Sequence, residues 1–237
     1  MAKRNDMTQR TTRAENRAKR GSSRLWWSFG LLASLMLLAP QGAGASTWPS
    51  HREQLLPIVG VTVGQRPTGI VTNLILSFDD RGDHEGLVVQ FRSTPGRFSR
   101  MAQTAVEQAI YRTAKAAGLS TDSWTVVLSV PYEGVTIYGD SLSAMVALGV
   151  VALAKGDFIP PDRVMTGTVA PDGHIAPVGA VPLKVAAANE AHMHRVLVPD
   201  EVDVTDGDWK TPFLVQVSPV GSVSQAYEAL TGRALKP

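Results

Sequence analysis

The segment from Ser143 to Ala154 is the feature of this sequence that most restricts the fold. It is almost wholly apolar and has the length of a helix. A helix that is apolar on every side has no face to offer to water, so other elements must cover it. The chain has 237 residues, 44% of them hydrophobic, which is enough to bury such a helix in one core. We therefore predict a single domain built around a central, buried helix.

The N-terminal part, residues 1–46, is predicted to be a leader. Residues 1–24 carry eight Lys/Arg and two Asp/Glu, whereas the rest of the chain carries 15 basic and 19 acidic residues. An apolar run at 25–39 and an Ala-Gly-Ala site at 43–45 follow. This order is typical of an export signal. The alternative is an anchor in the inner membrane through 25–39, although this run is shorter than the ~20 residues of a usual span. Both alternatives predict an exported body, either periplasmic or secreted, or anchored outside the cytoplasm.

The composition of the body argues against several classes of function. No cluster of Lys/Arg with interleaved aromatic residues is present, so we expect no nucleic-acid partner. The chain has no cysteine and can form neither a disulfide nor a thiolate metal site. His192 and His194 have no third candidate ligand near them and are interpreted as a solvated helix end. We expect no metal and no cofactor.

The secondary-structure pattern of residues 47–237 mixes strands and helices without strict alternation. Such a mixture favours an α+β fold over a doubly wound sheet. Strands are predicted at 58–63, 69–78, 86–91, 123–130, 164–169, 195–198 and 213–217, and helices at 97–117, 143–154, 184–191 and 222–230.

Two serines stand where the apolar helix begins. Unpaired backbone N–H groups and the helix dipole at such a position favour a developing negative charge, as an oxyanion site requires. We predict that Ser141 caps the helix through its hydroxyl and that Ser143 faces the site. The alternative is that both serines are only capping residues.

A lysine is the best candidate for the base that a nucleophilic serine needs. Lys184 is flanked by small and apolar residues, which would remove water from its ammonium group. Such burial lowers the pKa of a lysine, and the neutral amine can then act as a general base. The alternative is a solvated lysine at the start of a helix.

The chain resembles the proteolytic domain of Lon-type serine peptidases, particularly the archaeal membrane-associated branch. The resemblance extends from about Gly69 to Leu230. It rests on Tyr132-Glu133-Gly134-Val135, Gly139-Asp140-Ser141-Leu142-Ser143, Met165-Thr166-Gly167, Pro177-Val178-Gly179, Lys184 and Val196-Leu197-Val198-Pro199, which occur in the family's order.

The resemblance implies a serine endopeptidase with a Ser143–Lys184 dyad, whose fold resembles that of a ribosomal-protein domain. Thr166 would be hydrogen-bonded near the lysine, and backbone N–H groups near Ser143 would hold the oxyanion. Asp140 and Glu133 would shape the entrance or tune the lysine, with turn capping as the alternative role. The implied partners are a peptide or an unfolded protein as substrate and further copies of the chain in a homo-oligomeric ring.

The sequence departs from the family pattern at several places, one of them the loop from Glu133 to Asp140, which is slightly longer than in the archaeal branch. Ala180 replaces the second glycine of the Pro-Val-Gly-Gly segment, and Pro182 interrupts the polar pair before the lysine. The sequence also has no Gly-x-x-x-x-Gly-Lys-Ser/Thr phosphate loop. We therefore expect a peptidase that works without ATP.

Two other functions fit parts of the sequence. Gly139-Asp140-Ser141-Leu142 spells the motif of GDSL-type esterases, in which Ser141 would be the nucleophile. That family needs a late Asp-x-x-His, which is missing from this sequence. The third alternative is a non-enzymatic binding domain with the Lon fold, since a fold does not guarantee an activity.

Overall fold

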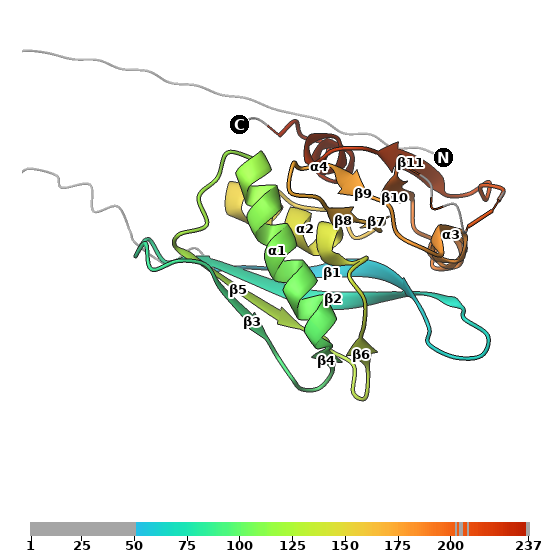
Figure 1. The fold of residues 1–237 in the computed structure, drawn as a ribbon, viewed down its shortest axis with the longest axis horizontal. Coiled ribbons are helices and arrows are strands. Elements are labelled where there is room, and N and C mark those ends of the chain that lie inside the picture. Colours follow the sequence, from blue (N-terminus) through green and yellow to red (C-terminus); the bar gives the residue numbers. More distant parts are fainter. Residues whose placement is uncertain (1–50, 202, 204–205, 208, 236–237) are drawn as a thin grey trace, which may run out of the picture. The chain divides into compact units, whose positions relative to one another are not determined.

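The computed structural model describes residues 51–201, 203, 206–207 and 209–235 (Figure 1). The predicted leader and the apolar run at 25–39 lie outside these residues. Within the described part of the chain, no helix combines the length and the apolar character that crossing a membrane requires.

A four-stranded sheet forms one layer. Its order is β1 (Arg52–Val61), β2 (Gly69–Asp80), β5 (Trp124–Ser129) and β3 (Val88–Phe91). The β1–β2 and β2–β5 pairs are antiparallel, and β3 lies parallel to β5. The register places Leu56 opposite Leu74 and Leu76 opposite Leu128. All four leucines are fully buried, so these cross-strand pairs face the core.

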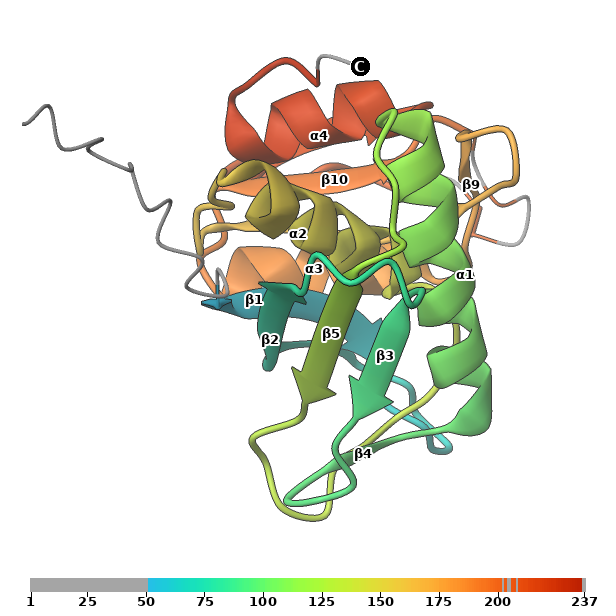
Figure 2. The ribbon, with the colours of Figure 1, turned by 90° about the vertical axis from the view of Figure 1, so that its left-hand side faces the viewer.

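Two helices pack together beside this sheet, α1 (Arg100–Ala116) and α2 (Ser143–Lys155) (Figures 1 and 2). The Ser99 hydroxyl caps α1 by accepting a hydrogen bond from the Ala102 N–H at 3.2 Å. Every residue of α2 from Ser143 to Leu153 is buried, because the sheet, α1 and the last helix all contact it. The prediction of a central apolar helix is confirmed.

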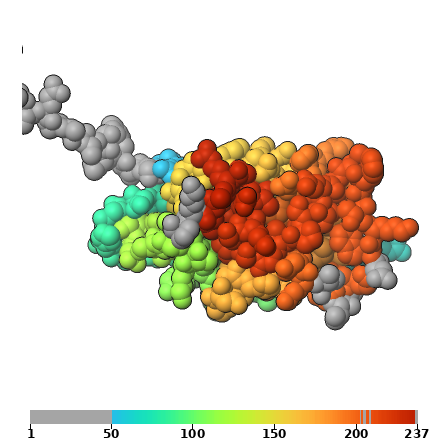
Figure 3. All heavy atoms as spheres, turned by 90° about the horizontal axis from the view of Figure 1, so that it is seen from above, coloured from blue at the N-terminus to red at the C-terminus, as the bar shows by residue number. Residues whose placement is uncertain are grey.

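A second, parallel sheet of three strands has the order β11 (Gln216–Val220), β10 (Arg195–Pro199) and β7 (Arg163–Met165). Helices α3 (Val181–Glu190) and α4 (Val223–Thr231) contact it. Two short pairs, β4 (Arg97–Phe98) with β6 (Thr136–Ile137) and β8 (Thr168–Val169) with β9 (Ile175–Ala176), complete the described strands. The C-terminal residues, in orange and red, cover one face (Figure 3).

The buried side chains form two clusters. The larger cluster fills the space among the four-stranded sheet, α1, α2 and α4. The smaller one joins α3 to β10, β7 and β11 and includes Val59 from β1. Ile58, the residue before Val59, belongs to the larger cluster. Successive side chains of a strand point to opposite faces, so β1 separates the two clusters.

The mixed order of helices and strands agrees with the predicted α+β class, but several predicted boundaries were wrong. The predicted strand at 58–63 begins at Arg52 and ends at Val61. The strand at 164–169 is split into β7 and β8 at Thr166-Gly167, where Gly167 has a φ of 152°. The strand at 213–217 begins only at Gln216, and the apolar side chain of Phe213 is 99% exposed.

Gly69, the first residue of β2, lies directly against α3. A Cβ at this position would overlap the Leu183 carbonyl oxygen and would lie 2.8 Å from the Ala187 Cβ. A helix carbonyl is fixed by its backbone and cannot turn aside as a flexible side chain can. The absence of a side chain at position 69 therefore sets how closely α3 approaches the β1–β2 hairpin.

We predict that Gly69→Ala lowers the free energy of unfolding by about 1–3 kcal/mol, because an added methyl group must push α3 away from β2. Gly64→Ala is the matched control, since a Cβ there would meet no atom within 4 Å. Urea unfolding of both variants measures the difference. Equal stability of the two variants would contradict the close contact between β2 and α3.

Candidate active site

The loop from Tyr138 to Leu142 leads from β6 into α2 and is tied to the β7–β8 corner. The Gly167 N–H donates to the Ser141 carbonyl at 2.9 Å, and the Ala144 N–H donates to the Gly167 carbonyl at 3.2 Å. The Thr166 N–H in turn donates to the Leu197 carbonyl of β10 at 3.0 Å. These backbone hydrogen bonds fix the start of α2 against the second sheet.

The hydroxyl of Ser141 does not cap α2, which contradicts our prediction. The cap residue of α2 is Leu142, which has helical dihedral angles, and no side chain caps this helix. Ser141 is instead half-buried in the wall of a groove. The burial of α2 on all sides holds its first turn in place, so the helix start does not depend on a capping hydroxyl.

Ser143 is 1% exposed, and its Oγ has no hydrogen-bond partner among the described residues. Leaving a buried hydroxyl unpaired costs about 1–3 kcal/mol, and a catalytic role is one of the explanations for such a group. The Ser143 N–H donates to the Asp140 carbonyl at 2.8 Å. The N–H groups of Ser143 and Ala144, which are near the predicted oxyanion position, therefore already donate hydrogen bonds to backbone carbonyls of the protein.

Lys184 lies in the first turn of α3 and is 2% exposed. Burial of its ammonium group lowers the pKa from the ordinary value of 10.5 to about 8, although the Asp206 and Asp140 carboxylates oppose this shift. At this pKa roughly one-tenth of the lysine is neutral at pH 7. The prediction of a desolvated lysine is confirmed, and the solvated alternative is wrong.

A groove of about 1240 Å³ brings the two halves of the predicted site together. Its walls are the ends of β1 and β2 at 58–63 and 70–73, residues 132 and 134–142 and the turn at 177–179. Lys184 lines this groove together with Asp140 and Ser141. Ser143 follows this wall but does not contribute to it, and its Oγ is not hydrogen-bonded to Lys184.

The residues predicted to support the dyad, Thr166, Asp140 and Glu133, lie at different positions relative to the groove. Thr166 is fully buried, and its hydroxyl donates to the Ser141 carbonyl at 3.4 Å. Thr166 thus contacts the loop that carries the serines. Asp140 is exposed in the groove wall, and its carboxylate acts on the Lys184 ammonium. Glu133 is exposed and lies outside the wall.

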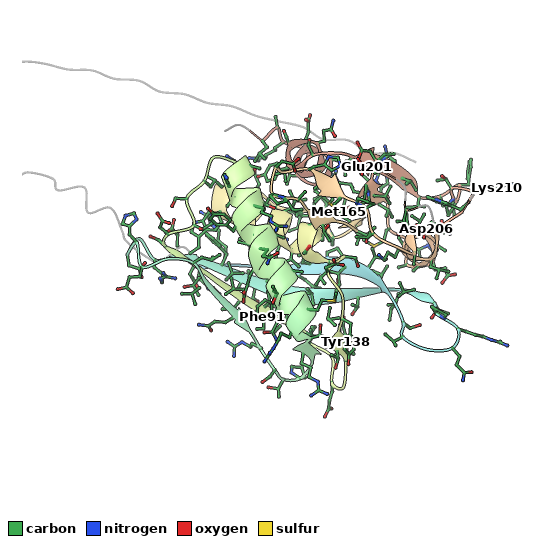
Figure 4. All side chains as sticks on the ribbon, in the orientation of Figure 1. Phe91, Tyr138, Met165, Glu201, Asp206 and Lys210 are labelled. Atoms are coloured by element: carbon green, nitrogen blue, oxygen red, sulfur yellow. The ribbon has the colours of Figure 1, made fainter. Side chains whose placement is uncertain are left out.

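One residue of the site was not predicted from the sequence. The Asp206 carboxylate lies beside α3 and acts on Lys184 more strongly than Asp140 does (Figure 4). It follows Lys184 by 22 positions and belongs to no motif. The only signal in the sequence is that α3 begins without a Ser, Thr, Asp or Asn as its cap. Within the described part of the chain, no group of three or more His, Asp or Glu residues could hold a metal ion.

Comparisons with known proteins match much of the chain to Lon-type proteases. Residues 98–209 match the family described as the Lon protease (S16) C-terminal proteolytic domain. The chain is 28% identical over 173 residues to the archaeal Lon protease of Archaeoglobus fulgidus, covering 71% of this chain and 27% of that protein. It is 31% identical over 192 residues to the archaeal Lon protease of Pyrococcus abyssi, covering 73% of this chain and 18% of that protein. The chain thus spans about a quarter or less of the length of these relatives.

We predict that Lys184→Met raises the free energy of unfolding at pH 7 by about 1–3 kcal/mol, because it removes a buried charge. The folded pKa of Lys184 is about 8 and the unfolded value is 10.5. Between these values the unfolded chain binds more protons, so the wild type gains stability as the pH rises. The advantage of Lys184→Met should therefore be largest below pH 8 and vanish near pH 10.5.

Urea unfolding at pH 7 and pH 10 measures this difference. Lys115→Met is the control, because Lys115 is an exposed lysine in the last turn of α1. Its stability relative to the wild type should change little between the two pH values. A Lys184→Met protein no more stable than the wild type at pH 7 would contradict the cost of the buried ammonium group.

Proposed function

Because the chain carries a Lon-type proteolytic domain, we propose that it is a serine endopeptidase in which Ser143 is the nucleophile and Lys184 the general base. The observation that carries this proposal is the buried Lys184, whose pKa of about 8 supplies a neutral amine near physiological pH. It lines the same groove as the loop that leads into Ser143. We further propose that the fold resembles that of a ribosomal-protein domain.

The proposed reaction begins when the neutral Lys184 amine takes the proton from the Ser143 hydroxyl. The Ser143 Oγ then attacks the peptide carbonyl, and the lysine returns the proton to the departing amine. Water hydrolyses the resulting acyl-enzyme through the same base. Hydrogen bonds of catalytic groups often form only when substrate binds, so the unpaired Oγ of Ser143 is compatible with this role.

Oxyanion stabilisation by the Ser143 or Ala144 N–H group requires a local rearrangement. The Ser143 N–H already donates to the Asp140 carbonyl, and the Ala144 N–H donates to the Gly167 carbonyl. A substrate oxyanion can accept hydrogen bonds from these N–H groups only after one or both of the present hydrogen bonds are broken. The loop at 138–142 is the segment that would move, because α2 itself is packed on every side.

The groove favours an extended peptide with apolar side chains. The strand ends at 58–63 and 70–73 contribute only uncharged residues, most of them Val, Ile or Thr. The described charged residues of the wall are Lys184, Asp140 and Asp203. The proposed substrate is therefore a peptide or an unfolded protein segment, with acidic side chains disfavoured beside the two aspartates.

The remaining parts of the proposal concern the context of the enzyme. The absence of a phosphate-loop motif from the sequence supports hydrolysis that needs no ATP. The basic and apolar composition of residues 1–46 supports export, with either a cleaved signal or an anchor through 25–39. Association into a homo-oligomeric ring is proposed from the family resemblance alone.

We predict that Ser143→Ala abolishes hydrolysis of a fluorogenic apolar peptide, whereas Ser141→Ala retains most of the activity. The Ser141 hydroxyl lines the groove but neither caps α2 nor attacks the substrate in the proposed mechanism. Initial rates of the two purified variants, compared at equal folded concentration, measure the difference. An inactive Ser141→Ala protein, together with an active Ser143→Ala protein that cleaves short-chain esters, would establish the esterase alternative. If the wild type binds peptides without cleaving them, the non-enzymatic alternative holds.

We also predict that the exported protein cleaves an unstructured substrate at the same rate with and without ATP, because its sequence encodes no nucleotide-binding loop. Cell fractionation and N-terminal sequencing of the mature protein locate it and identify its first residue. A first residue just after Ala45 supports a cleaved signal, whereas an intact Met1 in the membrane fraction supports an anchor. Cytoplasmic protein whose cleavage is stimulated by ATP would contradict this proposal.

A further inference from the structure

Helix α3 begins without a local cap. Its cap residue, Ala180, has a left-handed backbone with a φ of 60° and offers no side-chain hydrogen bond. Pro182 stands in the first turn and has no N–H, and no acidic residue lies in that turn. The first N–H groups of a helix need acceptors from outside the helix. At α3 these acceptors must come from a distant part of the chain.

Asp206 supplies them. One carboxylate oxygen, Oδ1, accepts the Ala180 N–H at 2.8 Å, and the other, Oδ2, accepts the Val181 N–H at 3.0 Å. The carboxylate is half-buried and belongs to the segment after β10, beside α3 (Figure 4). A negative charge at a helix N-terminus is also favoured by the helix dipole. Asp206 therefore acts as the cap that the local sequence of α3 lacks.

This cap lies one helical turn before Lys184. The Lys184 N–H donates to the carbonyl of Ala180 at 3.2 Å. Ala180, whose N–H is bound by Asp206, therefore also fixes the backbone of Lys184. The preceding residues at 177–179 form part of the groove wall. Loss of the Asp206 contacts would release both the first turn of α3 and this part of the wall.

We propose that Asp206 is a positioning residue, which fixes the first turn of α3 by accepting the Ala180 and Val181 N–H groups and thereby directs Lys184 into the groove. The structural part of this proposal stands on the hydrogen bonds alone. Its consequence for catalysis rests on the proposed function of Lys184 as the base.

The charge of Asp206 gives the proposal a second measurable consequence. Among the groups that oppose the lowered pKa of Lys184, Asp206 has the largest effect, followed by Asp140. Asp203 is a further acidic residue of the same groove wall. Strands β1 and β2, which pack against α3, contribute no charged side chain to that wall. Removal of the Asp206 charge should therefore lower the pKa of Lys184 further.

The test compares Asp206→Asn with Glu201→Gln in the full-length chain. Asn is close to Asp in shape but carries no charge and can accept only one of the two N–H groups. Glu201→Gln removes one negative charge from the same segment, where Glu201 is exposed and lies 3.6 Å from His174. Both variants are first made in the Ser143→Ala background, so that neither measurement depends on hydrolysis.

Two measurements in that background test the structural claim. Amide hydrogen exchange at Ala180 and Val181 should become about fivefold to tenfold faster in Asp206→Asn. The pKa of Lys184, followed by NMR of an isotope-labelled lysine ε-carbon, should fall by about 0.5–1 unit. The control should change neither quantity. Unchanged exchange and an unchanged titration in Asp206→Asn would overturn the proposal.

Kinetics with Ser143 restored test the consequence for catalysis. In Asp206→Asn the plateau value of kcat for a fluorogenic apolar peptide should fall about tenfold, with a smaller change in KM. The midpoint of the rate–pH curve should move to lower pH. Asp206→Glu, which retains the charge, should keep the wild-type midpoint. A purely structural role would reduce the rate in proportion to the folded fraction and leave the midpoint in place.

These experiments separate the failure of the two proposals. If the wild type does not cleave peptides, the proposed function is wrong, but the exchange and titration results still decide the role of Asp206. If the wild type is active and Asp206→Asn matches it in kcat, midpoint and exchange, Asp206 has no positioning role. If Asp206→Asn does not fold but Asp206→Glu does, amide exchange at Ala180 and Val181 is measured in Asp206→Glu instead. We then expect exchange faster than in the wild type but slower than the roughly fivefold to tenfold increase expected for Asp206→Asn.

Discussion

The burial of α2 on all sides is the constraint on which the rest of the described structure depends. The four-stranded sheet, α1 and α4 each cover part of this helix, and its first turn is tied to Gly167 by backbone hydrogen bonds. At its other end, Gly156 adopts a left-handed conformation, and the Arg52 guanidinium donates to the carbonyls of Leu153 and Ala154. The position of Ser143 therefore follows from core packing.

Lys184 is held by different means. It lies on α3, which packs against β2 where Gly69 leaves room, and its turn begins at a residue capped by Asp206. Burial of an ammonium group is unfavourable for folding and favourable for a general base, because both effects arise from the lost hydration. The candidate site thus combines a serine fixed by packing with a lysine fixed by a carboxylate cap.

The parts of the structure that could be predicted from the sequence are those with a local pattern. The apolar run of α2 predicted a buried helix, and the small residues around Lys184 predicted its desolvation. Ser141 was wrongly predicted as a cap, because the local preference of serine for helix starts is overruled here by the packing of α2. Phe213 and Leu214 suggested a strand but are exposed, since hydrophobicity alone does not fix where a strand begins. Asp206 could not be predicted, because its contact with Ala180 spans 26 positions.

The division of the core into two clusters has a consequence for the dynamics of the protein. The serine lies on a helix of the larger cluster, whereas the lysine lies on a helix of the smaller one. Regions with fewer buried apolar contacts open at lower free energy than the main core does. On warming, the smaller cluster would fluctuate first, so Ser143 and Lys184 would lose their relative alignment while α2 and its sheet stay folded. Loss of the proposed activity would then precede global melting, and it would be reversible as long as the larger cluster remained intact.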